Sequence, residues 1–192
     1  MAKKSRPGRL RIVAGKWRSR LLDVADVPGL RPTSERIRET VFNWLAPTIH
    51  GARCLDLFAG TGALGLEALS RGAGEVVFVE KSAVAAGAIR ASADTLEATG
   101  AEVRQVDALD FLQAEDNEHF DVIFLDPPFA TDMLGDLCRL LDKSSLIGVG
   151  SLVYLEDDRA RPQTELPSGW RLLKSKSAGS VRYSLAQVED RD

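Results

Sequence analysis

Cysteine and histidine are scarce in this chain of 192 residues, which contains two of each. Cys54 and Cys138 are far apart and lack the spacing of metal ligands, so we predict neither a disulfide framework nor a bound metal. His50 falls at a predicted helix end and His119 in a predicted polar loop, where both suit structural or solvated roles. We therefore expect chemistry that requires no histidine base.

Long apolar runs are also missing, so no stretch has the length needed to cross a bilayer. The basic N-terminus is not followed by the apolar segment of a signal peptide. A hydrophobic fraction of 44% and a charged fraction of 28% are ordinary for a globular domain. The simplest interpretation is a reduced, cytoplasmic protein with one domain and a small appendage.

Acidic residues are absent from the first 20 positions, while all 28 Asp and Glu residues of the chain follow them. Those 20 positions hold eight cations: Lys3, Lys4, Arg6, Arg9, Arg11, Lys16, Arg18 and Arg20. A basic arm on an acidic body predicts a polyanionic partner, although a solvated tail that aids solubility is the alternative. The mixture of apolar, aromatic and basic residues over 11–18 favours contact with nucleic acid.

The first 50 residues read as a small extension. Residues 9–13 and 17–24 are predicted strands of a hairpin around Ala14-Gly15-Lys16, from which Trp17 could pack inward or stack on RNA. A helix follows, with Thr33 as its expected N-cap and an apolar face that includes Ile37 and Leu45. Two cations of this helix, Arg36 and Arg38, fall off the apolar face.

Residues 51–188 alternate between strands and helices, which predicts a doubly wound, mostly parallel sheet. The expected strands are 52–58, 75–80, 103–106, 121–125 and 151–156. The expected helices are one that follows the stretch 59–65 and ends at about Arg71, and those over 82–99, 108–114 and 131–142. Two further strands, 171–177 and 181–188, meet at Ala178-Gly179-Ser180. They predict an antiparallel hairpin at the C-terminal end.

A glycine loop follows the first core strand. Gly60, Gly62 and Gly65 fit the pattern G-x-G-x-x-G between a strand and a helix, and Glu80 lies 20 residues after Gly60. The glycines allow close approach of the backbone to a ligand, and Glu80 can accept hydrogen bonds from ribose hydroxyls. The loop predicts a nucleoside cofactor but does not distinguish NAD from S-adenosylmethionine.

Three observations favour S-adenosylmethionine. Asp56 lies close to the loop, where its carboxylate suits an ammonium group better than a pyrophosphate. Asp107 and Ala108 follow a strand, where they can recognise an adenine ring and its amino group. No arrangement of Lys, Tyr or His suggests hydride transfer. The structural alternatives are a brace for the loop at Asp56 and a helix N-cap at Asp107.

The stretch Asp126-Pro127-Pro128-Phe129 follows the apolar run 122–125. The two prolines stiffen the loop and remove N–H donors, while the aspartate offers an acceptor and the phenylalanine a flat apolar face. Such a loop suits an amino group on a planar ring, although a capping turn with a core Phe129 is the alternative. If it binds an amine, Asp126 and the Pro127 carbonyl would accept its N–H groups.

These motifs resemble class I S-adenosylmethionine-dependent methyltransferases that act on exocyclic amino groups. The segments 11–18, 29–33, 36–45 and 55–71 are similar to bacterial 16S ribosomal RNA guanine-N2 methyltransferases, and the resemblance runs from about residue 9 to about residue 187. Lys3, Lys4 and an Ala-rich helix after Glu80 depart from the family pattern.

The resemblance implies methyl transfer to a guanine of the small (30S) ribosomal subunit by a monomer, with the first 50 residues as RNA contact and lid. It implies a catalytic loop of Asp126, Pro127, Pro128 and Phe129, which would hold a base that has left its stack. Cofactor contacts are expected from Asp56, Phe58, Ala59, Gly60, Thr61, Gly62, Glu80, Lys81, Asp107 and Ala108. RNA contacts are expected from Arg9, Arg11, Lys16, Trp17, Arg18, Arg20, Arg31, Arg36 and Arg38.

Three other functions fit parts of the pattern. A DNA adenine-N6 methyltransferase shares the Asp-Pro-Pro-Phe loop, but no insertion is large enough for a target-recognition segment. A non-catalytic RNA-binding assembly factor would not need the intact loop. A nicotinamide oxidoreductase could be distinguished by whether NAD or S-adenosylmethionine raises the melting temperature.

Overall fold

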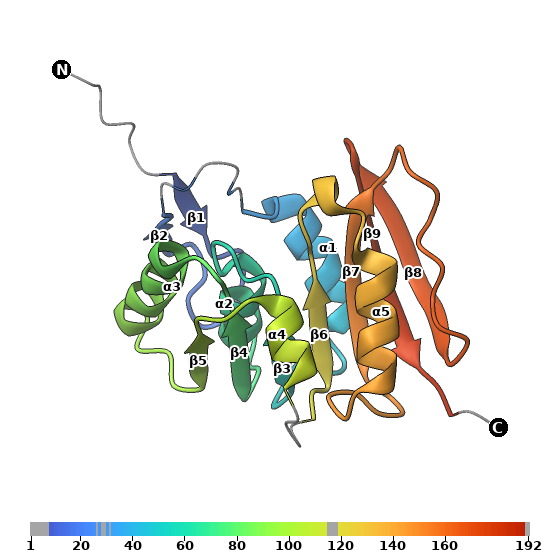
Figure 1. The fold of residues 1–192 in the computed structure, drawn as a ribbon. Coiled ribbons are helices and arrows are strands. Elements are labelled where there is room, and N and C mark those ends of the chain that lie inside the picture. The colour runs from blue at the N-terminus through green and yellow to red at the C-terminus, as the bar shows by residue number, and fades with distance from the viewer. Residues whose placement is uncertain (1–7, 26, 28–29, 31, 115–118, 191–192) are drawn as a thin grey trace.

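The computed structural model describes residues 8–25, 27, 30, 32–114 and 119–190. Seven strands form one sheet in the order β5-β4-β3-β6-β7-β9-β8 (Figure 1). Their bounds are β3 Arg53–Asp56, β4 Glu75–Val79, β5 Ala101–Arg104, β6 Val122–Leu125, β7 Leu152–Asp158, β8 Trp170–Ala178 and β9 Val181–Val188. The strands from β5 to β7 are parallel, whereas β9 is antiparallel to both of its neighbours. The predicted doubly wound sheet with an antiparallel C-terminal hairpin is confirmed.

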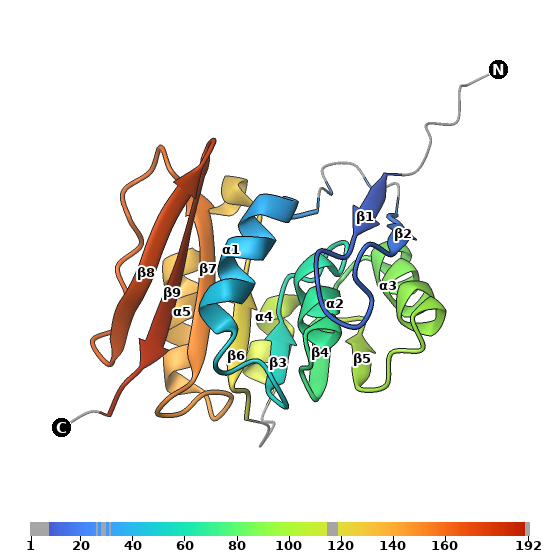
Figure 2. The same cartoon turned by 180° about the vertical axis from the view of Figure 1, so that it is seen from behind.

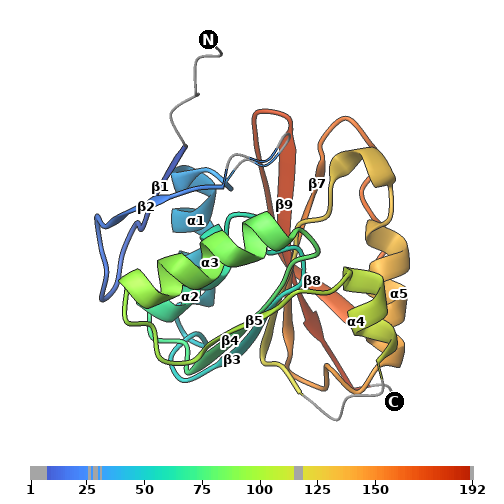
Figure 3. The ribbon, with the colours of Figure 1, turned by 60° about the vertical axis from the view of Figure 1, so that its left-hand side comes forward.

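Helices cover both faces of the sheet (Figure 3). They are α1 Glu35–Leu45, α2 Ala63–Ser70, α3 Ala83–Thr95, α4 Ala108–Gln113 and α5 Leu134–Lys143. Alternate strand residues serve two cores because successive side chains point to opposite faces. Cys54 and Val76 belong to the core with α1, α2 and α3, while Leu55 and Val77 belong to the core with α4 and α5.

The strand order reverses between β3 and β6. In open sheets of this kind, ligands bind outside the carboxyl ends of the strands at such a reversal. The glycine loop follows β3 and the Asp-Pro-Pro-Phe loop follows β6, so the fold brings the two motifs to this place. Among the described residues, no helix has the length and apolar character required to cross a membrane.

Several element boundaries differ from the prediction. The N-cap of α1 is Ser34, whose hydroxyl oxygen accepts from the Ile37 N–H, rather than Thr33. Helix α3 ends at Thr95 because Glu97 has a φ of 50°, which a helix cannot accommodate. Strand β5 begins at Ala101, two residues before the predicted start.

The N-terminal hairpin is shorter than predicted. Strands β1, Arg9–Arg11, and β2, Leu21–Asp23, pair over three residues each, and residues 12–20 form a loop packed on α2 (Figure 2). Gly15 has a φ of 85°, and a Cβ there would lie 1.9 Å from the Ser70 carbonyl oxygen. The Ser70 carbonyl accepts from the Lys16 N–H at 2.7 Å, and the Ser70 hydroxyl donates to the Ala14 carbonyl at 2.6 Å. The loop therefore follows the surface of α2 at backbone distance.

A buried ion network anchors the same loop. Glu67 of α2 is fully buried and accepts from the Val13 and Ala14 N–H groups at 2.8 and 3.0 Å. Its carboxylate also binds the guanidinium groups of Arg38 at 2.9 Å and Arg71 at 2.8 Å. Because buried charges are costly unless they are paired, this network ties the loop, α1 and α2 together.

Candidate functional site

The glycine loop leads from β3 into α2 through left-handed backbone. Gly60 and Gly62 have φ values of 54° and 76°, and Gly62 caps α2 without a side-chain hydrogen bond. The Gly62 N–H donates to the Ala59 carbonyl at 2.6 Å, which closes a tight turn. Ala59 is buried, while Phe58 and Thr61 are half-buried. We call this loop, with Asp56, Glu80, Asp107 and their neighbours, the glycine half of the site.

Each acid of the glycine half accepts hydrogen bonds from backbone N–H groups. Asp56 accepts from Gly65 at 3.0 Å, Glu80 accepts from Gly60 at 2.9 Å and Ser82 at 2.7 Å, and Asp107 accepts from Leu109 at 2.9 Å. Burial raises the pKa of Asp56 to about 7, against the effect of the Gly65 N–H, and the charge of Glu80 adds to the rise.

The structure thus shows both structural roles that the sequence allowed. Asp56 braces the start of α2, and Asp107 is the N-cap of α4. Glu80 also supports the glycine loop directly, which the sequence did not indicate. Lys81 is exposed beside it, and Ala108 is buried in the first turn of α4.

The proline half of the site consists of the Asp-Pro-Pro-Phe loop with Tyr154 and Glu156 of β7. Leu125 of β6 pairs with Leu155 of β7, so Asp126 and Glu156 come next on the two neighbouring strands. The Tyr154 hydroxyl donates to Glu156 at 2.7 Å, and the Thr33 hydroxyl donates to Asp126 at 3.5 Å. Burial raises the pKa of Asp126 well above its ordinary value, and the nearby charges of Glu156 and Asp56 raise it further.

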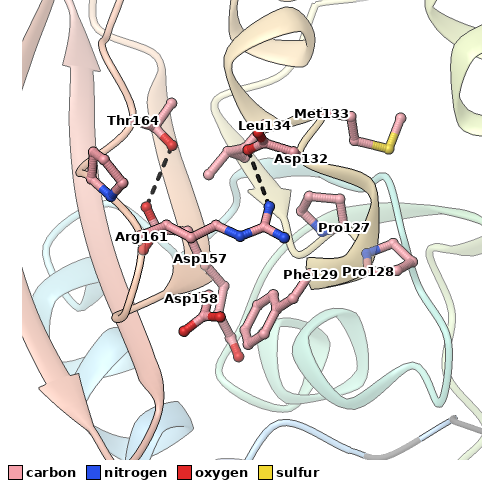
Figure 4. Close-up of a pocket in the computed structure, with 12 residues that line it drawn as sticks. Pro127, Pro128, Phe129, Asp132, Met133, Leu134, Asp157, Asp158, Arg161 and Thr164 are labelled. Atoms are coloured by element: carbon pink, nitrogen blue, oxygen red, sulfur yellow. Dashed lines mark hydrogen bonds and ion pairs between the residues drawn. The ribbon is translucent and has the colours of Figure 1, made fainter.

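A cleft opens beside this loop (Figure 4). Pro127, Pro128 and Phe129 line one side, and the end of β7 with the segment after it lines the other. Its empty volume is about 340 Å³, solvent at the mouth included. Arg161 forms an ion pair with Asp132 at 3.1 Å across the cleft. Phe129 is half-buried rather than a core residue, so one face of the loop can meet a planar ligand.

Two described residues between the hairpin and α1 lie against the two halves of the site. A Cδ atom of Leu30 lies 3.0 Å from the place that a Cβ on Gly60 would occupy, and Thr33 contacts Asp126. Leu30 therefore contacts the glycine half, and Thr33 contacts the proline half.

The predicted RNA contacts divide into exposed and buried side chains. Those exposed are Arg9, Arg11, Lys16, Arg18, Arg20 and Arg36, and Arg31 lies outside the described residues. Arg38 does not have the predicted accessibility for an RNA contact. The residue is 1% exposed, and its guanidinium donates to Glu67 and to the carbonyls of Thr33 and Arg11. The prediction that Trp17 contacts RNA is likewise not met, because Trp17 packs in the core and is 9% exposed.

Sequence reasoning missed Glu156, Tyr154 and Glu67. Glu156 ends a predicted strand, so the rule that identified Glu80 at a strand end could have identified it too. Tyr154 and Glu67 lie within regular elements and carried no such signal. No cluster of three or more potential metal ligands occurs among the residues described.

The strand order, with the glycine loop after β3 and the Asp-Pro-Pro-Phe loop after β6, is that of the class I methyltransferase fold. Comparisons with known proteins agree with this class. The chain belongs to the family described as "Conserved hypothetical protein 95", whose model matches residues 10–187.

Individual relatives cover nearly the whole chain. "Ribosomal RNA small subunit methyltransferase D" of Haemophilus influenzae is 44% identical over 183 residues, which are 94% of each chain. The solved structure titled "Putative methyltransferase yhhF from Escherichia coli" has a TM-score of 0.88 and 39% identity, and covers 95% of this chain and 99% of its own. "A putative sam-dependent methyltransferase from Streptococcus mutans" has a TM-score of 0.74 at 14% identity, covers 97% of this chain and 57% of its own, and shows the shared fold alone.

Proposed function

We propose that this protein transfers a methyl group from S-adenosylmethionine to the exocyclic N2 amine of a guanine in 16S ribosomal RNA. The observation that carries the proposal is the stiff, acceptor-rich Asp126–Phe129 loop beside the glycine loop at the sheet reversal. The relative named as a small-subunit ribosomal RNA methyltransferase supports the choice of RNA. We further propose that a monomer acts on the rRNA within a small-subunit particle or assembly intermediate.

The residues of the glycine half fit S-adenosylmethionine. Gly60 and Gly62 provide a backbone turn without side chains, and Asp56 and Glu80 are acceptors for an ammonium group and for ribose hydroxyls. Asp107 and Ala108 would face the adenine. When bound, the cofactor supplies a methyl group on a positively charged sulfur. The chain itself has only to hold this group in line with the incoming amine.

The residues of the proline half fit an aromatic amine. The guanine amino group is a weak nucleophile because its lone pair is delocalised into the ring, so orientation matters more than deprotonation. The carboxylate of Asp126 and the carbonyl of Pro127 would accept its two N–H groups and aim the lone pair at the methyl carbon. Phe129 would stack on the base, which must leave its own stack to enter the cleft. Positioning of this kind can contribute several kcal/mol to catalysis.

Proton release follows from the same geometry. Methylation makes the nitrogen acidic, so its proton can pass to Asp126 or to water after the carbon–nitrogen bond has formed. Glu156 is buried beside Asp126 and raises the pKa of Asp126, which makes the Asp126 carboxylate a better proton acceptor. No histidine takes part in this scheme.

The test is methyl transfer to defined RNA. The protein is incubated with labelled methyl donor and small-subunit particles from a strain that lacks it, and the labelled nucleoside is identified and mapped. We expect N2-methylguanosine at one site, with protein-free RNA as the parallel substrate. Label on adenine, or no label on either RNA substrate, would contradict the proposal.

A second experiment tests the arm. Replacing Arg9, Arg11, Lys16 and Arg18 by Ala should weaken RNA binding and flatten its dependence on salt. The reason is that binding releases fewer counterions from the RNA when the protein makes fewer phosphate contacts. An unchanged salt slope would show that the arm does not contact RNA.

A further inference from the structure

Strand β8 is an exposed edge of the sheet with an unusual charge. It stands last in the strand order and pairs only with β9 among the described strands. Its nine residues, WRLLKSKSA, include three cations and no acid, and all three cations are exposed. Outside the N-terminal arm the chain is acidic overall, so this strand differs from the body that it belongs to.

Lys174 and Lys176 are the two cations of this strand whose charge is not neutralised by a described acid. Arg171 forms an ion pair with Glu189, whereas neither lysine has an ion-pair partner among the residues that the structure describes. A register shift between Leu172 and Lys174 sets their direction, because it pairs Lys174 with Leu185 and Lys176 with Tyr183. Leu185 and Tyr183 belong to the core under α1, so both lysines lie on the α1 face of the sheet.

Arg159 extends this charge toward the hairpin tip. Its backbone N–H donates to the Ser180 carbonyl at 2.8 Å, and its exposed side chain has no ion-pair partner among the described residues. We call Arg159, Lys174 and Lys176 the C-terminal basic ridge. Arg159 lies outside β8, so the ridge is more than a property of one strand.

The ridge is level with the Asp-Pro-Pro-Phe loop. Lys176 pairs with Tyr183 and Tyr183 with Glu156, and Glu156 is the neighbour of Asp126. The N-terminal arm reaches the same carboxyl edge through Arg11, which forms an ion pair at 3.6 Å with Glu35, the first residue of α1. The loop of the arm extends away from that edge to the C-terminal end of α3, where Arg20 donates to the Thr95 carbonyl. Figures 1 and 2 show strands β1 and β2 and the β8–β9 hairpin at opposite ends of the sheet, with the loop that follows β6 between them.

We propose that the C-terminal basic ridge is a second phosphate-contacting surface for the RNA substrate. The inference rests on the proposed function and adds a path for the substrate. The RNA backbone runs from the arm across the Asp-Pro-Pro-Phe loop to Lys174, Lys176 and Arg159. Two basic surfaces on either side of the loop hold the backbone at both sides of the extruded base. Such contacts fix register and orientation on the RNA without reading its sequence.

Edge-strand lysines have another known use, which is to oppose pairing between exposed sheet edges. The two roles make different demands. An anti-aggregation lysine is needed for monodispersity, and its loss leaves RNA affinity unchanged. A phosphate contact is needed for affinity, and its loss lowers the slope of log affinity against log salt concentration.

The test measures that slope for binding to small-subunit rRNA, both free and in particles. Lys176→Gln is compared with Lys143→Gln, because Lys143 is an exposed lysine in the last turn of α5. Lys176→Gln should lower the slope by about 0.7 to 0.9, and Lys174→Gln with Lys176→Gln by about twice that amount. Lys143→Gln should leave it unchanged, and Lys174→Arg with Lys176→Arg should keep the wild-type slope.

Three results would overturn the inference. Unchanged slopes in the Gln variants would remove the phosphate contact, and aggregation with unchanged slopes would assign the lysines to edge protection. Weaker binding to particles with an unchanged slope on free rRNA would indicate contact with a ribosomal protein. Failure of the wild-type protein to methylate RNA would count against the proposed function instead, because the binding slopes are measured without the methyl donor.

Discussion

The acids of the glycine half and the proline half are held by different groups. In the glycine half, Asp56, Glu80 and Asp107 all accept from backbone N–H groups. In the proline half, Asp126 and Glu156 have raised pKa values and accept from the hydroxyls of Thr33 and Tyr154. Backbone donors are positioned by the local fold, whereas the proline half depends on side chains from three separate segments.

This difference suggests a division of labour. The carboxylates of the glycine half are already held in place by backbone N–H groups, so they need not move to accept hydrogen bonds from a ligand as well. The proline half holds two carboxyl groups close together in a poorly solvated place, which favours the neutral forms until a hydrogen-bond donor or a positive charge arrives. Substitutions in the two halves should therefore fail in different ways.

The largest expected effect is at Asp126. Asp126→Ala removes the acceptor that orients the amine, and transfer should fall by about a hundredfold or more. Cofactor affinity should stay near that of the wild type, because Asp126 lies in the other half. Single-turnover transfer and calorimetric cofactor binding measure the two quantities. Asp121→Ala, at the opposite end of β6, is the control. Full activity of Asp126→Ala would show that Asp126 does not orient the amine.

Asp56 offers a test through pH. Its pKa of about 7 in the folded protein exceeds its ordinary value of 3.8, so the neutral form stabilises the fold below pH 4 and this contribution is lost as pH rises through 7. Asp56→Asn keeps an acceptor for the Gly65 N–H and carries no charge. The ligand-free variant should exceed the wild type in unfolding free energy by roughly 4 kcal/mol at pH 8. The gain should vanish near pH 4 in urea titrations, and an equal gain at both pH values would contradict the assignment.

Glu80→Gln should weaken cofactor binding by about tenfold, because one of the two backbone N–H groups would face an amide nitrogen instead of an oxygen. Transfer at saturating cofactor should change much less. Glu75→Gln is a matched control at the amino end of the same strand, where the side chain pairs with Arg53. If Glu80→Gln lost methyl transfer but kept its affinity for the cofactor, the glycine half would not be limited to cofactor binding.

The smallest effect is expected at Glu156. Its charge raises the pKa of Asp126, so Glu156→Gln should lower that pKa and move the acid limb of the kcat/KM profile to lower pH. The variant should gain a few-fold in kcat/KM on that limb, with an unchanged plateau. Glu165→Gln, an exposed site, is the control. A plateau as low as that of Asp126→Ala would mean that Glu156 itself binds the base.

Much of the site could be predicted because its signals are local. The apolar run 122–125 followed by Asp126 and two prolines predicts a strand and the polar loop at its end. The same holds for Gly60 and Gly62, since only glycine readily adopts their positive φ values. The place of Asp107 before a helix also allows an N-cap, and the structure shows that role.

Other residues could not be assigned from neighbours in the sequence. Helical spacing places Arg38 off the apolar face of α1, yet the N-terminal loop and Glu67 enclose it from a second side. Trp17 could equally have faced solvent, and only the packing of the loop on α2 decided its burial. Glu156 becomes part of the site because β7 lies beside β6, which no local pattern states.

By itself, the sequence determined the alternation of strands and helices, the glycine turn and the stiff loop after β6, because these follow from periodicity and backbone preferences over a few residues. The tertiary structure alone decided which charges meet. Arg38 and Glu67, Asp126 and Glu156, and the free lysines of β8 acquire their roles from segments far away in the chain. The physical reason is that a charge is stabilised or perturbed by whatever surrounds it in space, and long-range packing sets those surroundings.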